Sequence, residues 1–389
     1  MLNIVETENK HTSGVYAKQT LTIVRGQGAS LFDENGVEYL DCSSGHGVAN
    51  LGHAHPKIAE ALYKQANTLI TLFETFPNDQ RAALMEKITA LVPGMDRVFF
   101  CNSGTEAVEA SFKFARISTG RKNIIAAMRA FHGRTFGSLS ATFNKKYREG
   151  FEPLLPGVSH VSYNNIEALD KAVNEETAAV ILEVVQGEGG VYPASAEYIQ
   201  AARRICDERG ALLIVDEIQT GFGRTGKMFA VQHFNVTPDL LTCAKSLAGG
   251  VPMGAVLIGP NVKNLTPGVH GSTFGGNPLS CAAANAALDV MREEDLPGQA
   301  AAKGAYLVEK LKKIECANIR EVRGLGLMVG IEMKQKVTGY IKAMQERKII
   351  ALNAGLTVIR LLPPLVITYE QIDHLVDVLT EVLIKETNE

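Results

Sequence analysis

Short apolar runs recur through the first part of the chain and alternate with longer segments of helical period. The runs cover residues 97–101, 123–128, 178–185, 211–217, 240–244 and 254–259. Between them, in segments such as 106–118 and 196–210, apolar residues repeat every three or four positions, which is typical of helices that bury one face. Strands that are apolar at nearly every position, separated by helices, favour a parallel sheet covered on both faces. The pattern therefore predicts an α/β fold with a mainly parallel sheet.

The pattern changes at about Asn277. Two long helical segments follow, then short strand-like runs and a final amphipathic helix, as expected of a smaller α+β unit. Near the N-terminus, Glu34-Asn35-Gly36 predicts a hairpin turn. A chain of 389 residues exceeds the length at which a single core usually stops growing. We therefore expect a large domain over residues 50–276 and a small domain formed by residues 1–49 and 277–389.

Composition narrows the classes of partner. Hydrophobic residues make up 46% and charged residues 21% of the chain, and the net charge is −3, so no basic field attracts nucleic acid. The six cysteines form no CxxC pair, which argues against a disulfide framework and a zinc ribbon. No apolar run resembles a signal core or reaches the length of a membrane span. These features predict a cytoplasmic protein that acts on small molecules or on a protein partner.

One lysine and one aspartate carry the most specific chemistry. Lys245 directly follows the apolar run LLTCA, and Asp216 ends the run ALLIV. A partly desolvated lysine amine can attack an aldehyde, and a carboxylate opposite it can keep a pyridine nitrogen protonated. This pair predicts a site for pyridoxal 5'-phosphate (PLP). The alternative is a surface lysine and an ordinary aspartate at a strand end, so further motifs must decide.

A phosphate site is expected where a strand meets a helix in CNSGTEAVEAS. Ser103, Gly104 and Thr105 stand at the predicted helix start, where unpaired backbone amides and the helix dipole favour an anion. In the alternative reading Ser103 or Thr105 only caps the helix. A second candidate is the polar loop HGSTFGGNP, in which Ser272 and Thr273 can contact a phosphate or a substrate, unless the loop is simply a turn.

Aromatic and charged residues suggest how a ring and a carboxylate would be bound. Phe131 and Arg134 follow an apolar strand in FHGR, where Phe131 can stack on a pyridine ring and Arg134 can bind a carboxylate. Phe131 can instead belong to the hydrophobic core, and Arg134 can be a solvated surface charge. Arg360, inside the apolar TVIRLLPPL, is a stronger candidate because a buried arginine needs an anion. Glu188, in VVQGEGG, is either a solvated turn carboxylate or the partner of such an arginine.

Two motifs suggest other chemistry. Residues 221–228, GFGRTGKM, have the glycine and lysine spacing of a P-loop ATPase. However, Met228 stands where that motif needs serine or threonine, and the acidic strand precedes the loop instead of following it. His53 and His55, just before Pro56, do not by their spacing define a metal site, and capping or core roles are better explanations.

Seven motifs occur in the order of the class-III, ornithine-type PLP aminotransferases, and the chain resembles that family from Tyr16 to its last helix. The motifs are NSGTEAVEAS, FHGRT, VVQGEGG, VDEIQTGFGRTG, AKSLAGG, HGSTFGGNP and VIRLLPPL. The resemblance implies fold type I of PLP-dependent transferases, with a mainly parallel seven-stranded sheet in the large domain. Within the family the chain is most similar to the acetylornithine branch and to its sister branch in lysine biosynthesis.

The resemblance also implies roles around the cofactor. Lys245 would form the Schiff base and move the proton, and Asp216 would pair with the ring nitrogen. Phe131 would stack on the ring, and Gln219, after Glu217 and Ile218 in the same cofactor-binding stretch, would reach the ring oxygen. Gly104 and Thr105, beside Ser103, would bind the phosphate, with Thr273 contributed by a second subunit of a homodimer.

Substrate roles follow from the same resemblance. Arg360 would bind the α-carboxylate of glutamate, and Glu188 would form an ion pair with Arg360 when that carboxylate is absent. Arg134 and Ser272 would contact the substrate, and Tyr16 would lie near its entrance. His46, in SSGHGVANLGHAHP, departs from the apolar residue expected in many acetylornithine enzymes, so the acyl end of the substrate stays open.

The expected reaction moves a terminal amino group between an acylated ornithine or lysine chain and 2-oxoglutarate, which becomes glutamate. The acyl group is open between acetyl, succinyl and a small acidic amino-group carrier protein. Other reactions of the same family remain alternatives, namely succinylornithine or ω-amino acid transamination and a semialdehyde aminomutase. The P-loop ATPase is the disfavoured alternative without PLP.

Overall fold

The computed structural model describes residues 3–385. Its centre is a seven-stranded sheet in the order β4-β12-β11-β10-β7-β5-β6. Only β12 runs antiparallel to its neighbours, which confirms the predicted mainly parallel α/β sheet. The strands are β4 (Arg97–Cys101), β5 (Asn123–Ala127), β6 (Val158–Val161), β7 (Thr177–Glu183), β10 (Leu212–Asp216), β11 (Leu240–Cys243) and β12 (Gly254–Ile258).

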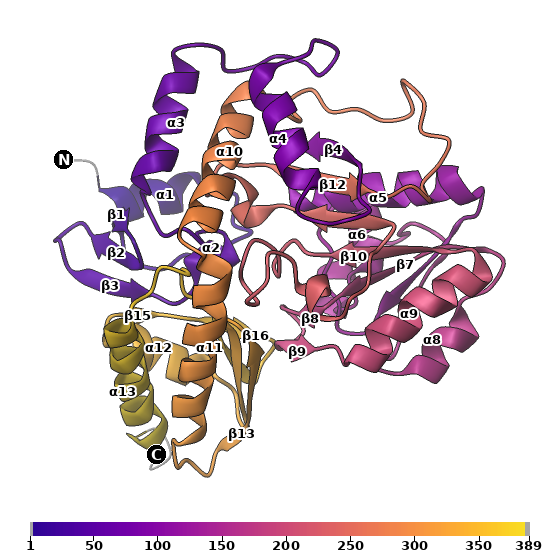
Figure 1. The fold of residues 1–389 in the computed structure, drawn as a ribbon. Coiled ribbons are helices and arrows are strands. Elements are labelled where there is room, and N and C mark those ends of the chain that lie inside the picture. Colours follow the sequence, from indigo (N-terminus) through magenta and orange to yellow (C-terminus); the bar gives the residue numbers. More distant parts are fainter. Residues whose placement is uncertain (1–2, 386–389) are drawn as a thin grey trace.

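Both faces of this sheet are buried. On β10, Ile214 belongs to one hydrophobic cluster with Val108 and Phe112 of α5, whereas its neighbour Leu213 belongs to another cluster with Ile205 of α9. Successive strand residues point to opposite faces, so each face has its own helical cover (Figure 1). The helices around the sheet are α5 (Gly104–Thr119), α6 (Phe136–Ala141), α7 (Lys145–Arg148), α8 (Ile166–Ala172) and α9 (Ala196–Arg209).

The six apolar runs correspond to strands of the sheet, but the seventh strand, β6, has no such run. Its sequence VSHV is only partly buried, because it lies at the edge of the sheet beside β5 alone. An edge strand can expose part of its surface and so need not be apolar throughout, although β4 at the opposite edge does have an apolar run.

Segments from the N-terminal and C-terminal parts of the chain pair in a small sheet of order β1-β2-β3-β15. The predicted turn at Glu34-Asn35-Gly36 connects β2 to β3, and the Asp33 carboxylate accepts hydrogen bonds from the backbone N–H groups of Asn35 and Val37. This sheet comprises β1 (Ile23–Gln27), β2 (Ser30–Asp33), β3 (Glu38–Asp41) and β15 (Ile349–Ile350), and the helices of the N-terminal part of the chain are α1 (Ile4–His11), α2 (Ser44–Gly47), α3 (Pro56–Ala66) and α4 (Asp79–Thr89).

The C-terminal part begins with α10 (Pro278–Glu293), which packs against α3 and α4, and with α11 (Leu296–Lys312). Figure 1 shows α10 and α11 as a column between the N-terminal sheet and the large sheet. Behind it lies a sheet of β13 (Ile319–Leu325), β14 (Met328–Met333), β17 (Val358–Leu361) and β16 (Leu352–Ala354), with α12 (Thr338–Glu346) and α13 (Tyr369–Lys385). No helix within residues 3–385 is long and apolar enough to cross a membrane.

Candidate active site

Polar side chains gather where the parallel strands β7, β10 and β11 end. Asp216, the last residue of β10, is level with Glu183 on β7 and with Thr242 on β11. Lys245 follows β11 and begins the short 3-10 helix η2 (Lys245–Ala248). Because the carboxyl ends of parallel strands share one edge of the sheet, these side chains converge although they lie far apart in sequence.

A cavity of about 480 Å³ opens at this edge, and we call it the inner cavity. Most of the candidate residues identified from the sequence line this cavity. Its lining includes Ser103, Gly104, Thr105, Phe131, Arg134, Glu188, Asp216, Ile218, Gln219 and Lys245. The predicted nucleophile, carboxylate, aromatic ring and helix start therefore border one space.

Lys245 is held in an uncommon backbone conformation, with φ of +46°. Residues other than glycine adopt this left-handed backbone conformation at an energetic cost, and such strain is concentrated at functional sites. The residue borders the cavity and is half-buried. Desolvation by burial is the largest effect on it and lowers the pKa of Lys245 to about 8, so a substantial fraction of the amine is neutral and nucleophilic near pH 8.

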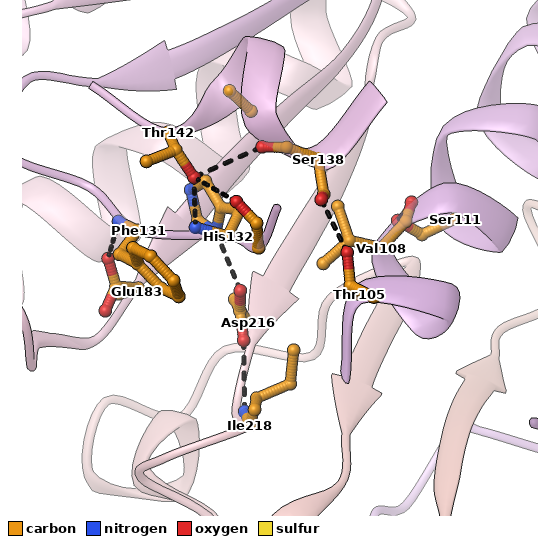
Figure 2. Close-up of polar contacts among 12 residues, drawn as sticks. Thr105, Val108, Ser111, Phe131, His132, Ser138, Thr142, Glu183, Asp216 and Ile218 are labelled. Carbon is orange, nitrogen blue, oxygen red and sulfur yellow. Dashed lines mark hydrogen bonds and ion pairs between the residues drawn. The ribbon is translucent and has the colours of Figure 1, made fainter. Parts of the chain in front are cut away.

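Asp216 is oriented by two partners (Figure 2). One carboxylate oxygen lies 2.7 Å from Nδ1 of His132, and the other accepts the backbone N–H of Ile218 at 3.0 Å. Burial disfavours the charged imidazole, but the hydrogen bond to Asp216 and its charge outweigh burial and raise the pKa of His132. The histidine thereby helps to orient the Asp216 carboxylate. Sequence reasoning left His132 without a role, although it stands between Phe131 and Arg134 in the motif.

Glu183 was also missed, and it shapes the same wall of the cavity. Its carboxylate accepts the backbone N–H groups of Phe131 at 3.0 Å and Gly187 at 3.1 Å, so it fixes the loop that carries the aromatic ring. Burial raises the pKa of Glu183 to about 7. The sequence signal was an acidic residue at the end of a strand that is otherwise almost wholly apolar, TAAVILE.

The start of α5 has both a capping residue and backbone amides without a helical acceptor, so the two interpretations of its sequence are compatible. Ser103 is the N-cap, and its hydroxyl accepts the backbone N–H of Glu106. The amides of Gly104 and Thr105 precede any intrahelical acceptor and stay available for an anion. A Cβ on Gly104 would lie 2.8 Å from Ile218, so glycine permits the close approach of the helix start to the end of β10.

Arg360 lies on β17 and is fully buried. Its guanidinium pairs with Glu188 at 2.6 Å and donates to the side-chain oxygen of Gln219 at 3.3 Å. Burial disfavours the Glu188 carboxylate, but Arg360 outweighs this effect and lowers the pKa of Glu188. His46 Nδ1 lies 3.5 Å from the other terminal nitrogen of Arg360. The residue that departs from the family pattern therefore adjoins the buried arginine.

Four other candidates lie outside the inner cavity. The Glu217 carboxylate turns away to the backbone N–H groups of Ala230 and Val231. Ser272 accepts a hydrogen bond from Asn102 beside α5, and Thr273 is exposed. The Tyr16 side chain is also exposed, near the N-terminus.

The two competing motifs have structural roles. The loop 221–228 leads into the 3-10 helix η1 (Ala230–His233) and not into the α-helix that a P-loop needs. Its Arg224 is buried and donates to the backbone oxygens of Leu327 and Pro363. His53 bonds to Asp41 at 2.7 Å, and no group of three potential metal ligands occurs within residues 3–385.

The donor set of the inner cavity fits PLP. It offers a low-pKa amine at Lys245, a carboxylate at Asp216 for a ring nitrogen, and the aromatic face of Phe131. The open amides at the start of α5 suit a phosphate. Gly104 leaves room at the site where a Cβ would press on Ile218. These groups would hold the cofactor by its aldehyde, its ring and its phosphate.

Known proteins resemble this chain over nearly its whole length. The family model of class-III aminotransferases matches residues 13–383. A [LysW]-aminoadipate semialdehyde transaminase from Deinococcus radiodurans is 53% identical, with 97% of this chain and 89% of that protein covered. An acetylornithine aminotransferase from Methanocaldococcus jannaschii is 45% identical, with 98% of each covered. The crystal structure of ornithine aminotransferase from Toxoplasma gondii superposes with a TM-score of 0.95 at 33% identity, covering 99% of this chain and 95% of that one.

Proposed function

Because this chain belongs to the class-III aminotransferases, which use PLP, we propose that it transfers the terminal amino group of an acylated or carrier-bound ornithine or lysine chain. The partner reaction converts glutamate to 2-oxoglutarate, and the biosynthetic direction runs towards the amine. Two relatives are transaminases of a [LysW]-linked semialdehyde, and another is an acetylornithine aminotransferase. The observation that carries the proposal is that Lys245, Asp216 and Glu188 border one cavity and that Glu188 pairs with the buried Arg360.

Bound in the inner cavity, PLP supplies an aldehyde carbon for the amino group and a protonated ring that accepts an electron pair. Lys245 would move the proton: its neutral Nζ would take the proton from the substrate carbon that bears nitrogen and, in the same half-reaction, deliver it to the former aldehyde carbon of the bound cofactor. The Asp216 carboxylate, hydrogen-bonded to His132, would pair with the ring nitrogen. Phe131, whose backbone is fixed by Glu183, would pack against the ring.

The Arg360–Glu188 pair explains how one site serves two substrates. Glutamate carries a carboxylate on the reacting carbon, whereas a terminal amine has none. We infer that the glutamate carboxylate takes the place of Glu188 on Arg360, and that Glu188 neutralises Arg360 when the terminal amine is bound. The short buried contact between them supports this exchange, since a buried arginine without an anion is costly. Arg134, exposed on the rim, would bind the remaining carboxylate.

We also infer that the enzyme is a homodimer with shared sites. Thr273 and the neighbouring Phe274 are exposed in one protomer, and so are Ile70, Phe73 and Phe76. Exposed apolar residues in such number favour a protein interface. Pairing of two copies would bring the Ser272–Thr273 loop to the phosphate site of the other copy.

The direct test supplies the PLP-loaded protein with 2-oxoglutarate and N-acetylornithine, N-acetyllysine, ornithine or lysine, and measures glutamate. Turnover of an acylated substrate, well above that of the free amino acid, is expected. Absence of glutamate from every acylated diamino acid, with the glutamate half-reaction still intact, would reject the small acylated substrates and leave only the carrier-bound chains of the proposal.

A further inference from the structure

Glu188 lies in the loop of a short hairpin that reaches the C-terminal sheet. The hairpin pairs β8 (Val185–Gln186) with β9 (Tyr192–Pro193), and we call residues 185–193 the Glu188 hairpin. Its second strand, β9, lies beside β13 of the C-terminal sheet (Figure 1). The residues that follow Glu188 are therefore within reach of side chains on β13.

Arg323 of β13 binds the backbone at this end of the hairpin. Its Nη2 donates to the backbone oxygen of Gly190 at 2.7 Å, and its Nε donates to the backbone oxygens of Gly190 and Val191, each at 3.1 Å. The buried guanidinium also lies 3.8 Å from the centre of the Tyr192 ring. Because a planar guanidinium holds several acceptors in one fixed arrangement, Arg323 fixes three consecutive residues of the hairpin.

Two carboxylates hold Arg323 itself in place. Its Nη1 donates to Glu332 at 2.6 Å and to Glu321 at 2.7 Å. The Tyr192 hydroxyl donates to the same oxygen of Glu332 at 2.9 Å. Burial disfavours the Glu332 carboxylate, but the hydrogen bonds from Arg323 and Tyr192 outweigh burial and lower the pKa of Glu332. The arginine therefore has a charged partner on the side opposite the hairpin carbonyls.

The hairpin depends on outside support because its backbone is strained. Gly190 has a φ of +121° and Val191 a φ of +56°. A β-branched residue in the left-handed region is a rare outlier, and it persists only where the surrounding structure enforces it. Val191 is fully buried, and a Cβ added to Gly330 of β14 would lie 3.0 Å from the Cβ of Val191. The C-terminal sheet therefore packs directly on the strained residue.

Arg323 is level with Arg360 in the C-terminal sheet. Arg323 lies opposite Gly330 of β14, and Gly330 lies opposite Arg360 of β17. Residues directly opposite in antiparallel strands share one face of the sheet. This row of three residues therefore holds the hairpin at two points. Arg360 pairs with the Glu188 carboxylate at 2.6 Å, and Arg323 binds the backbone two and three residues further along the chain.

We propose that Arg323 is a positioning residue that sets how strongly Glu188 competes for Arg360. With the end of the hairpin anchored, the Glu188 carboxylate returns to one place whenever a substrate carboxylate leaves Arg360. A loosened hairpin spreads this carboxylate over many positions, so that it competes less with a substrate and neutralises Arg360 less completely. The inference rests on the proposed function, because it takes Glu188 as the group that exchanges with a substrate carboxylate.

Binding of glutarate to the PLP-loaded protein tests this role without turnover, by calorimetry. Glutarate is a dicarboxylate like glutamate but has no amine, and it reaches Arg360 only by displacing Glu188. Arg323→Lys keeps the positive charge but cannot bind two carbonyls and two carboxylates at once. We expect this variant to bind glutarate about threefold more tightly, because the competing Glu188 contact is less populated. General damage to the site would weaken binding instead.

Three further variants make the test specific. Arg320→Lys is the matched control, because Arg320 lies on the same strand and donates to the same Glu332 but is largely exposed; its glutarate affinity should be unchanged. Glu332→Gln removes the charged partner of Arg323, and it should tighten glutarate binding by a smaller factor even if Arg323→Lys does not fold. Within Glu188→Gln, which has no competing carboxylate, Arg323→Lys should have no further effect.

The two half-reactions give an independent measurement. Arg323→Lys should slow the half-reaction with N-acetylornithine about fivefold, since Arg360 is more often left without an anion. The glutamate half-reaction should be unchanged or faster. Equal losses in both half-reactions would overturn the inference, and so would unchanged or weaker glutarate binding, or a tightening that persists within Glu188→Gln. If no acylated or carrier-bound diamino acid reacts with the unmodified protein, the proposed function fails, whereas the glutarate titration still decides the role of Arg323.

Discussion

Nδ1 of His132 lies 2.7 Å from Oδ2 of Asp216, and both side chains are buried. The pair connects the loop after β5 to the end of β10, and it sets the charge at the inner wall of the cavity. His132 acts through Asp216, so we describe it as a positioning residue.

Replacement of His132 by phenylalanine should weaken catalysis without emptying the site. A hydrogen bond to a charged group contributes about 1.5–3 kcal/mol, so kcat should fall about tenfold to hundredfold, with a smaller change in KM. The absorption band of bound PLP should titrate at a shifted pH, because the charge that supports Asp216 is gone. His160→Phe is the control, since His160 bonds only to the backbone oxygen of Ala141. An unchanged spectrum and kcat in His132→Phe would contradict this role.

The pH dependence of His132 has a defined sign. Its pKa is raised in the folded protein, so the stabilisation by the His132–Asp216 pair is complete below the ordinary histidine pKa and is lost as pH rises through the raised value. Chemical unfolding of the cofactor-free protein should therefore show a loss of stability above neutral pH that is smaller in His132→Phe. A parallel pH profile for both proteins would argue against a charged histidine.

Attachment of PLP should report the low pKa of Lys245. Because only the neutral amine attacks an aldehyde, the rate of attachment to the cofactor-free protein should rise with pH and level off near the pKa of about 8. Borohydride trapping followed by peptide mass spectrometry locates the modified lysine. Lys245→Ala should bind PLP without a covalent bond and lose at least about 100-fold in kcat, the usual contribution of a general base. A rate that rises only above pH 10, or an active Lys245→Ala, would exclude Lys245 from this chemistry.

Glu188→Gln should separate the two half-reactions. The variant leaves Arg360 buried without its anion, which disfavours the terminal-amine substrate by about tenfold in kcat/KM. The glutamate half-reaction should be unchanged or faster, because its carboxylate no longer competes with Glu188. Stopped-flow measurement of each half-reaction gives the comparison. Equal losses in both would show that Glu188 has another role, and Glu197→Gln, at an acidic residue in the first turn of α9, controls for loss of charge.

Gly104→Ala should lower the affinity for PLP. The new Cβ would lie 2.8 Å from Ile218, so the helix start must move away from its position beside the end of β10. We expect an affinity loss of about tenfold, since close-packed groups forced apart cost about 1–3 kcal/mol. Ile218→Ala combined with Gly104→Ala should restore part of it by removing the obstructing atoms. Equilibrium dialysis measures the affinity, and additive losses in the double variant would rule out this contact as the cause.

Local features of the sequence determined much of the fold and part of the site. The apolar runs marked six strands of the large sheet, five of them central strands that are buried on both faces and one the edge strand β4. Ser103, Gly104 and Thr105 indicated a helix start through their capping chemistry, while Asp216 ends β10 and Lys245 comes shortly after β11. Such signals depend on neighbours within a few residues, and so they are readable along the chain.

Only the tertiary structure decided the pairings. His132 meets Asp216 and Arg360 meets Glu188 across long separations in sequence, because different strands end at the same edge of the sheet or pack against it. The same packing turned Glu217 away from the cavity to the backbone of η1 and placed Arg134 against the ring of Tyr147 in α7. The contact between two side chains depends on which strands become neighbours, and this is a property of the folded chain as a whole.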